Sequence, residues 1–369
     1  MKHHTVGPRS IIAIALLPLL IILASCTITR YHTDLLVATG KGFESGIGFP
    51  SNKAQDPPLI RAAKSGDVGQ VRSLLEKGEN ASVSNTYGET ALMWAALRGH
   101  DSIVEVLLGN RVDMDAKDLS NYRLTALAAA AAKGHSSIVD LLLKRGANMN
   151  GPALIFAASN GHEPVVRVLL NAGIDTKIRP FTILVRGVIP TPAGNTALLS
   201  AIASGHSEIV KLLIGNGADV NVRYVDWNPR SKEELEFDKT ALMIAAEYGK
   251  TDIVKILLDG NANINARHFT EWEALMYAVW RKHAETVRVL LRGGADVNAK
   301  YRGDTALMLA ARNGDATTVQ ILIAARADVN AKIQLEGALR AVGDTPLSIA
   351  RKEGHSKVVE MLKNAGAME

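Results

Sequence analysis

One pattern returns along most of this chain and limits the fold more than any other feature. Its clearest copy runs Thr90-Ala-Leu-Met-Trp-Ala-Ala96, continues with Gly99-His100 and ends with Ile103-Val-Glu-Val-Leu-Leu108. We count nine copies, which begin near residues 57, 90, 125, 152, 196, 240, 273, 305 and 345. The basic unit is about 33 residues long, a period that predicts a solenoid in which each unit packs mainly against its neighbours.

Each unit predicts two short helices. The threonine at its start can accept a hydrogen bond from a backbone N–H and so cap the first helix. The leucine and alanines that follow give a narrow apolar stripe, and a glycine such as Gly99 can end the helix in a left-handed conformation. The Ile-Val-x-x-Leu-Leu run predicts a second amphipathic helix, and the Ala-Asp-Val-Asn run after it predicts a hairpin.

These elements recur in register, and together they resemble the ankyrin repeat over residues 57–369. The resemblance implies an all-α solenoid of helix-turn-helix units joined by β-hairpin fingers. It also implies that a partner lies against the hairpin tips and the exposed side of the first helices. A single unit cannot bury its apolar face alone, so the terminal units are expected to act as caps.

The glycine that ends the second helix is replaced in three units, by Arg111, Asn261 and Arg326. Asparagine tolerates the left-handed conformation and arginine does so less readily. We therefore expect a different cap at Arg111 and Arg326. If the helix end at Arg326 is left-handed after all, Arg326→Gly would stabilise the domain.

The N-terminus is a separate segment. Lys2 and Arg9 precede an apolar run, Ile11–Leu23, which is short for a membrane span and suits the core of a signal peptide. The run ends in Leu23-Ala24-Ser25-Cys26, which resembles a bacterial lipobox and implies removal of residues 1–25 and lipidation of Cys26. Cys26 is the only cysteine, so an exported domain forms no internal disulfide. An uncleaved membrane anchor is the alternative, and both place the repeats outside the cytoplasm.

Residues 26–56 are expected to be the lipidated cysteine and a flexible tether, because glycines and a proline interrupt any helical pattern. Thr27 follows the cysteine. In lipoproteins similar to those of enterobacteria, an aspartate at that place favours retention in the inner membrane. The resemblance therefore favours the outer membrane, with the repeats facing the periplasm.

Charge and motifs argue against several function classes. The formal charge is +5, and a chain that starts at Cys26 keeps 40 of the 42 basic residues beside 37 acidic ones, which does not favour nucleic-acid binding. No metalloprotease, nucleophile-elbow or phosphate-loop motif is present, so we expect neither an enzyme nor a cofactor. Six of the ten histidines share the slot after the first helix, where copies about 10 Å apart cannot share one metal ion. We expect them to hydrogen-bond adjacent backbone.

The repeat register predicts a partner-binding strip on the hairpin tips and the exposed side of the first helices. Aromatic and cationic residues are most frequent there in repeats six to eight, where Lys239 and Glu247 also occupy positions of the strip. Trp280 and Tyr248 have the alternative of packing against the next helix, and we expect Met93 and Trp94 to belong to the core. The predicted binding residues are Tyr87, Arg98, Tyr122, Lys133, Phe181, Trp227, Phe237, Tyr248, Phe269, Trp272, Trp280, Arg281, Tyr301 and Arg312.

Three inserts interrupt the repeats, at residues 179–193, 224–238 and 333–342. All three fall between a second helix and the next first helix, so they are expected on the finger side. The first can form a hairpin that turns at Arg186-Gly187. Neutral drift is one explanation of such loops, and their clustering on one edge favours a shared partner site.

The sequence thus predicts a monomeric, lipid-anchored periplasmic scaffold that binds another protein, for example as an inhibitor, an immunity factor or an accessory factor. Repeats five to eight and the inserts 179–193 and 224–238 are the expected site. Two alternatives are a lipoprotein that organises the envelope and an enzyme with an unrecognised site in the concave groove.

Overall fold

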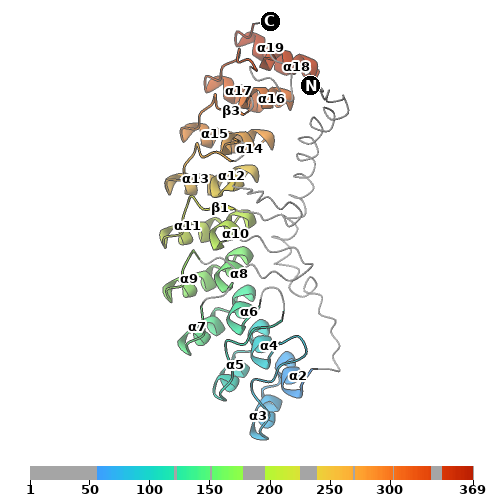
Figure 1. Ribbon diagram of the computed structural model, residues 1–369, viewed down its shortest axis with the longest axis vertical. Helices are drawn as coiled ribbons and strands as arrows, with labels where there is room; N and C mark the ends of the chain where they lie inside the picture. The colour runs from blue at the N-terminus through green and yellow to red at the C-terminus, as the bar shows by residue number, and fades with distance from the viewer. Residues whose placement is uncertain are drawn as a thin grey trace, which may run out of the picture. The chain divides into compact units, whose positions relative to one another are not determined.

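The computed structural model describes residues 56–119, 123–149, 152–177, 196–224, 239–268, 271–301, 303–333 and 343–368. These residues belong to one compact unit, Asn52–Glu369, and form a row of helix pairs in two layers (Figure 1). The predicted architecture of stacked helix pairs is confirmed. The predictions for Cys26, for residues 27–55 of the tether and for insert 179–193 lie outside the described residues, as does almost all of the other two inserts. The predicted tether ends one residue too late, because Asp56 pairs with Lys64 of the first repeat.

The first layer holds the first helix of each repeat. Its members are α2 (Pro58–Ser65), α4 (Ala91–Arg98), α6 (Ala126–Lys133), α8 (Ala153–Asn160), α10 (Ala197–Ser204), α12 (Ala241–Glu247), α14 (Ala274–Trp280), α16 (Ala306–Arg312) and α18 (Pro346–Lys352). Each of these helices contacts the first helix of the next repeat. The buried alanines of α6 and its neighbours permit this approach, because a methyl side chain keeps two helix backbones close.

The second layer holds the second helices. They are α3 (Val68–Glu76), α5 (Asp101–Leu108), α7 (Ser136–Lys144), α9 (Glu163–Asn171), α11 (Ser207–Gly215), α13 (Thr251–Asp259), α15 (Ala284–Arg292), α17 (Ala316–Ala324) and α19 (Ser356–Asn364). Each packs on the first helix of its own repeat. In α5, Ile103, Val104 and Leu107 are buried, which is the face that the Ile-Val-x-x-Leu-Leu pattern predicts.

Local hydrogen bonds explain why the first helices begin where they do. The threonines at positions 90, 125, 196, 240, 305 and 345 each accept a hydrogen bond from the backbone N–H three residues later, at 3.1–3.3 Å. The expected threonine caps are therefore present. Pro57, Pro152 and Glu273, which replace the threonine, make no such bond.

The fingers contain short antiparallel strand pairs. β1 (Arg223–Tyr224) pairs with β2 (Lys239–Thr240), and β3 (Lys300–Tyr301) pairs with β4 (Asp304–Thr305). Before each pair, an Asp-x-Asn turn connects neighbouring units. In one such turn Asp296 Oδ1 accepts from the Asn298 N–H at 2.9 Å, and Asn298 Oδ1 accepts from the Asp328 N–H of the next repeat at 2.8 Å. The recurring Asp-Val-Asn run is therefore a connector between repeats.

The expectation of a different cap at Arg111 and Arg326 is wrong. Both residues are left-handed, with φ of 51° and 65°, as is Asn261 with φ of 63°. At Arg326 the N–H donates to Ile323 O and the next N–H donates to Leu322 O. The same two bonds close a helix that ends at a glycine. The packing of the repeat therefore outweighs the preference of arginine for a right-handed conformation.

The described residues on either side of the last insert, Ile333 and Gly343, lie next to each other. Ile333 is buried with Met308, Ala331 and Ile349, and its backbone bonds with Asp344 and Gly343. The core therefore reaches one residue into the predicted insert. None of the helices in the described ranges is both long enough and apolar enough to span a bilayer.

Candidate protein-binding surface

One pair of positions recurs on the first layer: the residue just before the capping position and the residue eight further on. We call this pair a rung. In repeats one, six, eight and nine the rung is an ion pair, namely Lys64–Asp56 at 2.6 Å, Lys239–Glu247 at 2.7 Å, Arg312–Asp304 at 2.6 Å and Lys352–Asp344 at 2.5 Å. At each of these rungs two groups of opposite charge are paired. In repeat eight the pair is incomplete within the described residues, because Asp304 Oδ1 and Arg312 Nε are buried and have no hydrogen-bond partner.

The rung of repeat seven is aromatic instead. The rings of Trp272 and Trp280 meet edge to face, with centroids 5.7 Å apart. Trp272 makes two more such contacts, with Tyr277 at 5.1 Å and with Tyr301 at 5.8 Å. Edge-to-face pairs contribute about 0.5–1.5 kcal/mol beyond area burial. This aromatic cluster (Trp272, Tyr277, Trp280 and Tyr301) therefore holds its own rings in place, while only Tyr277 is buried.

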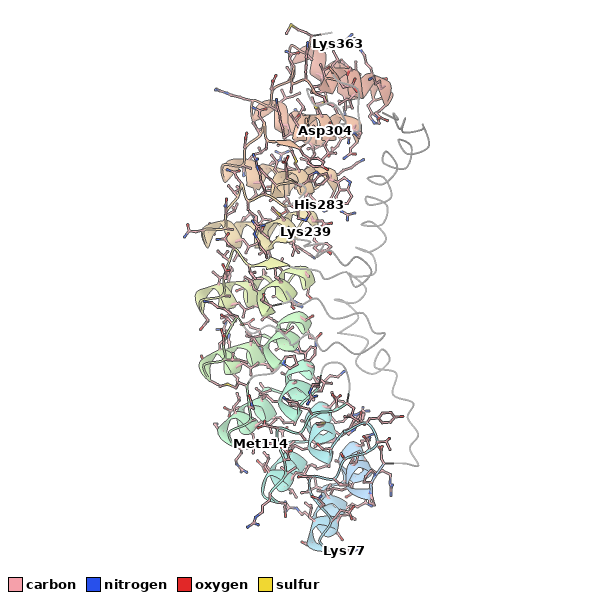
Figure 2. The ribbon with its side chains drawn as sticks, viewed as in Figure 1. Lys77, Met114, Lys239, His283, Asp304 and Lys363 are labelled. Carbon is pink, nitrogen blue, oxygen red and sulfur yellow. The ribbon has the colours of Figure 1, made fainter. Side chains whose placement is uncertain are left out.

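Two cations lie over these rings. The Arg281 guanidinium is 4.0 Å from the Trp280 ring centroid, and the Lys239 ammonium is 4.8 Å from that of Tyr277. Both cations also pair with Glu247, at 3.1 Å and 2.7 Å, and the Glu247 side chain is only 3% exposed. One buried carboxylate at the end of α12 thus fixes a lysine from β2 and an arginine that follows α14. Figure 2 labels Lys239, His283 and Asp304, which mark this part of the stack.

Burial shifts the pKa values of three titratable groups in repeats six and seven. His268 is buried, and desolvation lowers its pKa to about 4, with further lowering by Lys239 and Arg223. Burial raises the pKa of the Glu273 carboxyl, against a bond from Arg267 Nε at 3.2 Å. Burial, with the charge of Glu247, also raises the pKa of Tyr248 to about 12. At neutral pH the imidazole and the phenol are therefore uncharged.

A second aromatic site lies in repeats one and two. Trp94 Nε1 donates to Glu89 at 3.1 Å, and the Lys64 ammonium is 3.8 Å from the Trp94 ring centroid. Burial raises the pKa of Asp56, but hydrogen bonds from Lys64 and Asn85 outweigh it, so that pKa is below its usual value.

Trp94 itself is half-exposed, so its assignment to the core is wrong, whereas Met93 is buried as expected. The fourth position after the cap faces the same side as the rungs. Phe156 and Tyr277 occupy the same position and are buried, so the exposure of Trp94 depends on its neighbours.

The recurring histidines connect repeats, as expected. The Nε2 atoms of His135, His162, His206, His283 and His355 each bond a backbone carbonyl at the end of the preceding first helix, at 2.9–3.2 Å. Each ring also lies against the glycine that follows that helix. Burial lowers the pKa of His162, so its imidazole is neutral at neutral pH. In the part of the chain that the structure describes, no group of three His, Cys, Asp or Glu residues is arranged to hold a metal ion.

The structure separates the predicted binding residues into groups. Trp272, Trp280, Arg281 and Tyr301 come together in or beside the aromatic cluster, and Tyr248 follows Glu247 directly. Arg312 belongs to the next rung. Tyr87 and Arg98 lie in repeat two and Lys133 ends α6, away from the cluster along the stack. Tyr122, Phe181, Trp227, Phe237 and Phe269 lie outside the described residues.

Sequence reasoning missed two parts of this surface. Trp94, which we had assigned to the core, is half-exposed, and Tyr277, which packs against Trp272, was not considered. The spacing of eight between Asp56 and Lys64, and again between Asp304 and Arg312, was a usable signal. It recurs with opposite charges and is broken by two tryptophans in repeat seven.

Comparisons with known proteins bear on the fold. Among solved structures, the human ASB11 ankyrin repeat domain is similar, with a TM-score of 0.53 and 22% sequence identity, over 65% of this chain and 99% of that domain. Among curated proteins, the mitochondrial disaggregases of Homo sapiens and Bos taurus are 52% and 39% identical, each over 69 residues. This stretch is 19% of the present chain and 10% of each relative, so the chain spans about a tenth of their length.

A family model described as "Ankyrin repeats (3 copies)" matches residues 35–118, 59–152, 112–180, 148–224, 225–301 and 300–368. These matches together run from residue 35 to residue 368. The matches and the stacked helix pairs lead to one conclusion: the chain belongs to the ankyrin repeat family.

Proposed function

We propose that this chain is a lipid-anchored scaffold in the bacterial periplasm that binds another protein through the aromatic cluster of repeat seven. Ankyrin repeats generally mediate binding between proteins. The observation that carries the proposal is the rung at which two half-exposed tryptophans replace the ion pair found in repeats one, six, eight and nine. Tryptophan, tyrosine and arginine dominate binding hot spots, because they combine a large apolar area with a polar group.

The geometry favours a preorganised site. The Trp272 ring is held by three aromatic neighbours, and Arg281 is held by both Trp280 and Glu247. These side chains therefore lose little rotamer freedom when a partner covers them. The described chain stops at Tyr224 in β1 and resumes at Lys239 in β2, the lysine that pairs with Glu247.

The test is affinity capture from periplasmic and membrane extracts, followed by a binding constant for the captured protein. We expect a protein that the wild type retains and that the triple variant Trp272→Ala, Trp280→Ala, Arg281→Ala loses. Arg288→Ala is the matched control, because Arg288 lies on α15 of the same repeat in an exposed pair with Glu285. Circular dichroism verifies that each variant is folded. Equal capture by the wild type and the triple variant contradicts this site.

The lipid anchor rests on the lipobox-like Leu23-Ala24-Ser25-Cys26 and on Cys26 being the only cysteine. We expect a clickable palmitate analogue to label the wild type in cells and not to label Cys26→Ser. Fractionation is expected to recover the wild type from the outer membrane. A labelled Cys26→Ser, or an unlabelled wild type, contradicts the proposal.

We also propose that the chain is a monomer without enzymatic activity and without a cofactor. The support is the nearly balanced charge and the lack of a catalytic motif in the sequence. Generic hydrolase substrates are expected to stay intact, and sedimentation equilibrium is expected to give the mass of one chain. Turnover that follows the purified protein contradicts the first expectation.

A further inference from the structure

We infer that repeats six and seven form one block of the stack, with a joint on either side at which the stack opens. One joint lies between repeats five and six and the other between repeats seven and eight. The joints are a property of the stack itself and do not depend on the proposed function. They follow from where the histidine link between repeats is present and where it is missing.

At six of the eight junctions between the described helix pairs, a histidine ring lies against the glycine that ends the first helix of the preceding repeat. These histidines are His100, His135, His162, His206, His283 and His355. A Cβ atom added to the glycine would come within 2.6–3.0 Å of the ring, which is closer than side chains normally pack. The histidine therefore requires a glycine opposite it. Five of the six rings also bond the backbone of the preceding helix.

The junction between repeats five and six lacks this link. Lys250 stands in the histidine position, and its ammonium lies beside Gly205. In the described part of the chain, the Lys250 side chain donates no hydrogen bond. A lysine side chain also has more rotatable bonds than an imidazole ring, so holding it in one place costs more entropy. This residue therefore joins the two repeats less firmly than a histidine would.

The junction between repeats seven and eight lacks the link as well. Lys282 replaces the glycine and keeps the left-handed backbone, with φ of 61°, and Asp315 replaces the histidine. The two replacements belong together, because the Cβ atom of Lys282 would take the place of a histidine ring. Asp315 instead caps its own helix, α17, by accepting from the Thr318 N–H at 3.1 Å.

The contacts that remain at this junction are weaker. The Trp280 carbonyl, which occupies the acceptor position of the link, receives Asn313 Nδ2 at 3.5 Å, the outer limit of a hydrogen bond. Lys282 Nζ donates to the Asn313 carbonyl at 3.0 Å, but this bond is exposed to water. Neither contact replaces a ring that is packed against a glycine and bonded to the helix end.

The junction between repeats six and seven is held more firmly. His283 Nε2 bonds the Glu247 carbonyl at 3.0 Å, and Arg281 pairs with the Glu247 carboxylate at 3.1 Å. The hydroxyls of Thr251 and Thr286 add a bond of 2.8 Å between the second helices, and Thr286 is buried. The stability of a solenoid is roughly a sum of contributions from repeats and from the interfaces between neighbours. The stack therefore opens on either side of repeats six and seven before it opens between them.

The joint after repeat seven passes through the aromatic cluster. Trp272, Tyr277 and Trp280 belong to repeat seven. Tyr301 lies in β3, which pairs with β4 directly before α16 of repeat eight. Opening of this joint draws Tyr301 away from Trp272, whose ring centroid is 5.8 Å from that of Tyr301 in the stacked state. The cluster is therefore complete only while repeats seven and eight are stacked.

The test is native-state hydrogen exchange of the full chain, read by mass spectrometry at urea concentrations below the unfolding transition. We expect the amides of α12–α15 to share one opening reaction and those of α16–α19 to share another, with α10 and α11 opening separately from both. An end that frays one repeat at a time would instead release α18 and α19 before α16 and α17. That result overturns the inference, as does a boundary between α13 and α14.

Two variants change the link on either side of repeat six. Lys250→His places a ring opposite Gly205, so it is expected to slow exchange in α12–α15 about fivefold, the effect of one net hydrogen bond. His283→Ala removes the link between repeats six and seven, so α12 and α13 are expected to open separately from α14 and α15. Unchanged exchange of α12–α15 in Lys250→His overturns the inference.

A double-mutant cycle tests the joint after repeat seven. Lys282→Gly makes room for a ring, but it also removes strain at a left-handed residue, so its effect is compared in two backgrounds. We expect Lys282→Gly to slow exchange in α16–α19 about fivefold more in the Asp315→His background than in the wild type. Equal effects in the two backgrounds overturn the inference. Circular dichroism verifies that each variant is folded.

Discussion

Glu247 is the residue whose removal tests most directly how the candidate surface around the aromatic cluster is built. Its carboxylate is 3% exposed and holds Lys239 at 2.7 Å and Arg281 at 3.1 Å. Glu247→Ala would leave both cations over the aromatic rings without their counter-charge. Removing one partner of a fully buried pair costs about 3–5 kcal/mol.

The expected loss is smaller here, because water reaches the two cations. Lys239 and Arg281 keep 19% and 33% exposure, so solvent compensates part of the missing charge, and we expect a loss of about 2 kcal/mol. The backbone carbonyl of Glu247 still accepts from His283 at 3.0 Å, so the link between repeats six and seven is retained.

The assay is urea unfolding followed by circular dichroism, with the free energy of unfolding compared at a constant slope. Glu285→Ala is the control, since Glu285 and Arg288 form an exposed pair at 3.6 Å in the same part of the stack. We expect Glu285→Ala to cost less than about 0.5 kcal/mol. The reasoning is refuted if Glu247→Ala destabilises no more than Glu285→Ala, because the buried carboxylate would then contribute nothing beyond a surface pair.

Three further predictions address other contacts. Burial depresses the pKa of His268 from 6.5 to about 4, so its neutral imidazole contributes fully to the free energy of unfolding above pH 6.5, and this contribution is lost as the pH falls to 4. Urea unfolding should show the free energy of unfolding fall by up to roughly 3 kcal/mol across this range, and His268→Gln should abolish this pH dependence. Lys250 replaces the recurring histidine and lies against Gly205, so Lys250→His should form the corresponding bond to the Ala203 carbonyl and raise the free energy of unfolding by about 0.5–1.5 kcal/mol. An unchanged midpoint of urea unfolding would contradict the role given to the histidines. Arg326→Gly should stabilise the domain by a few tenths to about 1 kcal/mol, because φ is 65° at this exposed residue, and a lower melting temperature would contradict it.

Much of the repeat architecture could be predicted because it depends on contacts close in sequence. The Thr90 cap bonds a residue three positions away, and Gly99 ends the same helix in a left-handed conformation. The histidine after that glycine also follows the pattern, and its bond to the preceding repeat recurs in five repeats. A short motif is sufficient for such features, because each copy has the same local geometry.

The candidate site was predictable only in part. The register placed Trp272, Trp280 and Arg281 on the exposed side of the first helices, and the structure brings all three together. It did not show that Glu247 holds Arg281 from 34 residues away, because that contact depends on how closely two repeats pack. The exposure of Trp94 was missed for a related reason. The residue at the fourth position after the cap is buried at Ile349 and half-exposed at Trp94, so the same place in the repeat has different surroundings in different repeats.

The amino-acid pattern alone was enough for the two helices of each repeat and for the threonines that cap the first helices, since bonds within one turn of helix carry that information. The packing of the repeats decided the rest. It forces Arg111 and Arg326 into a left-handed conformation that arginine seldom adopts, and it selects which charges face each other across a rung. Both depend on distances between side chains of different repeats, and those distances exist only after the helices have stacked.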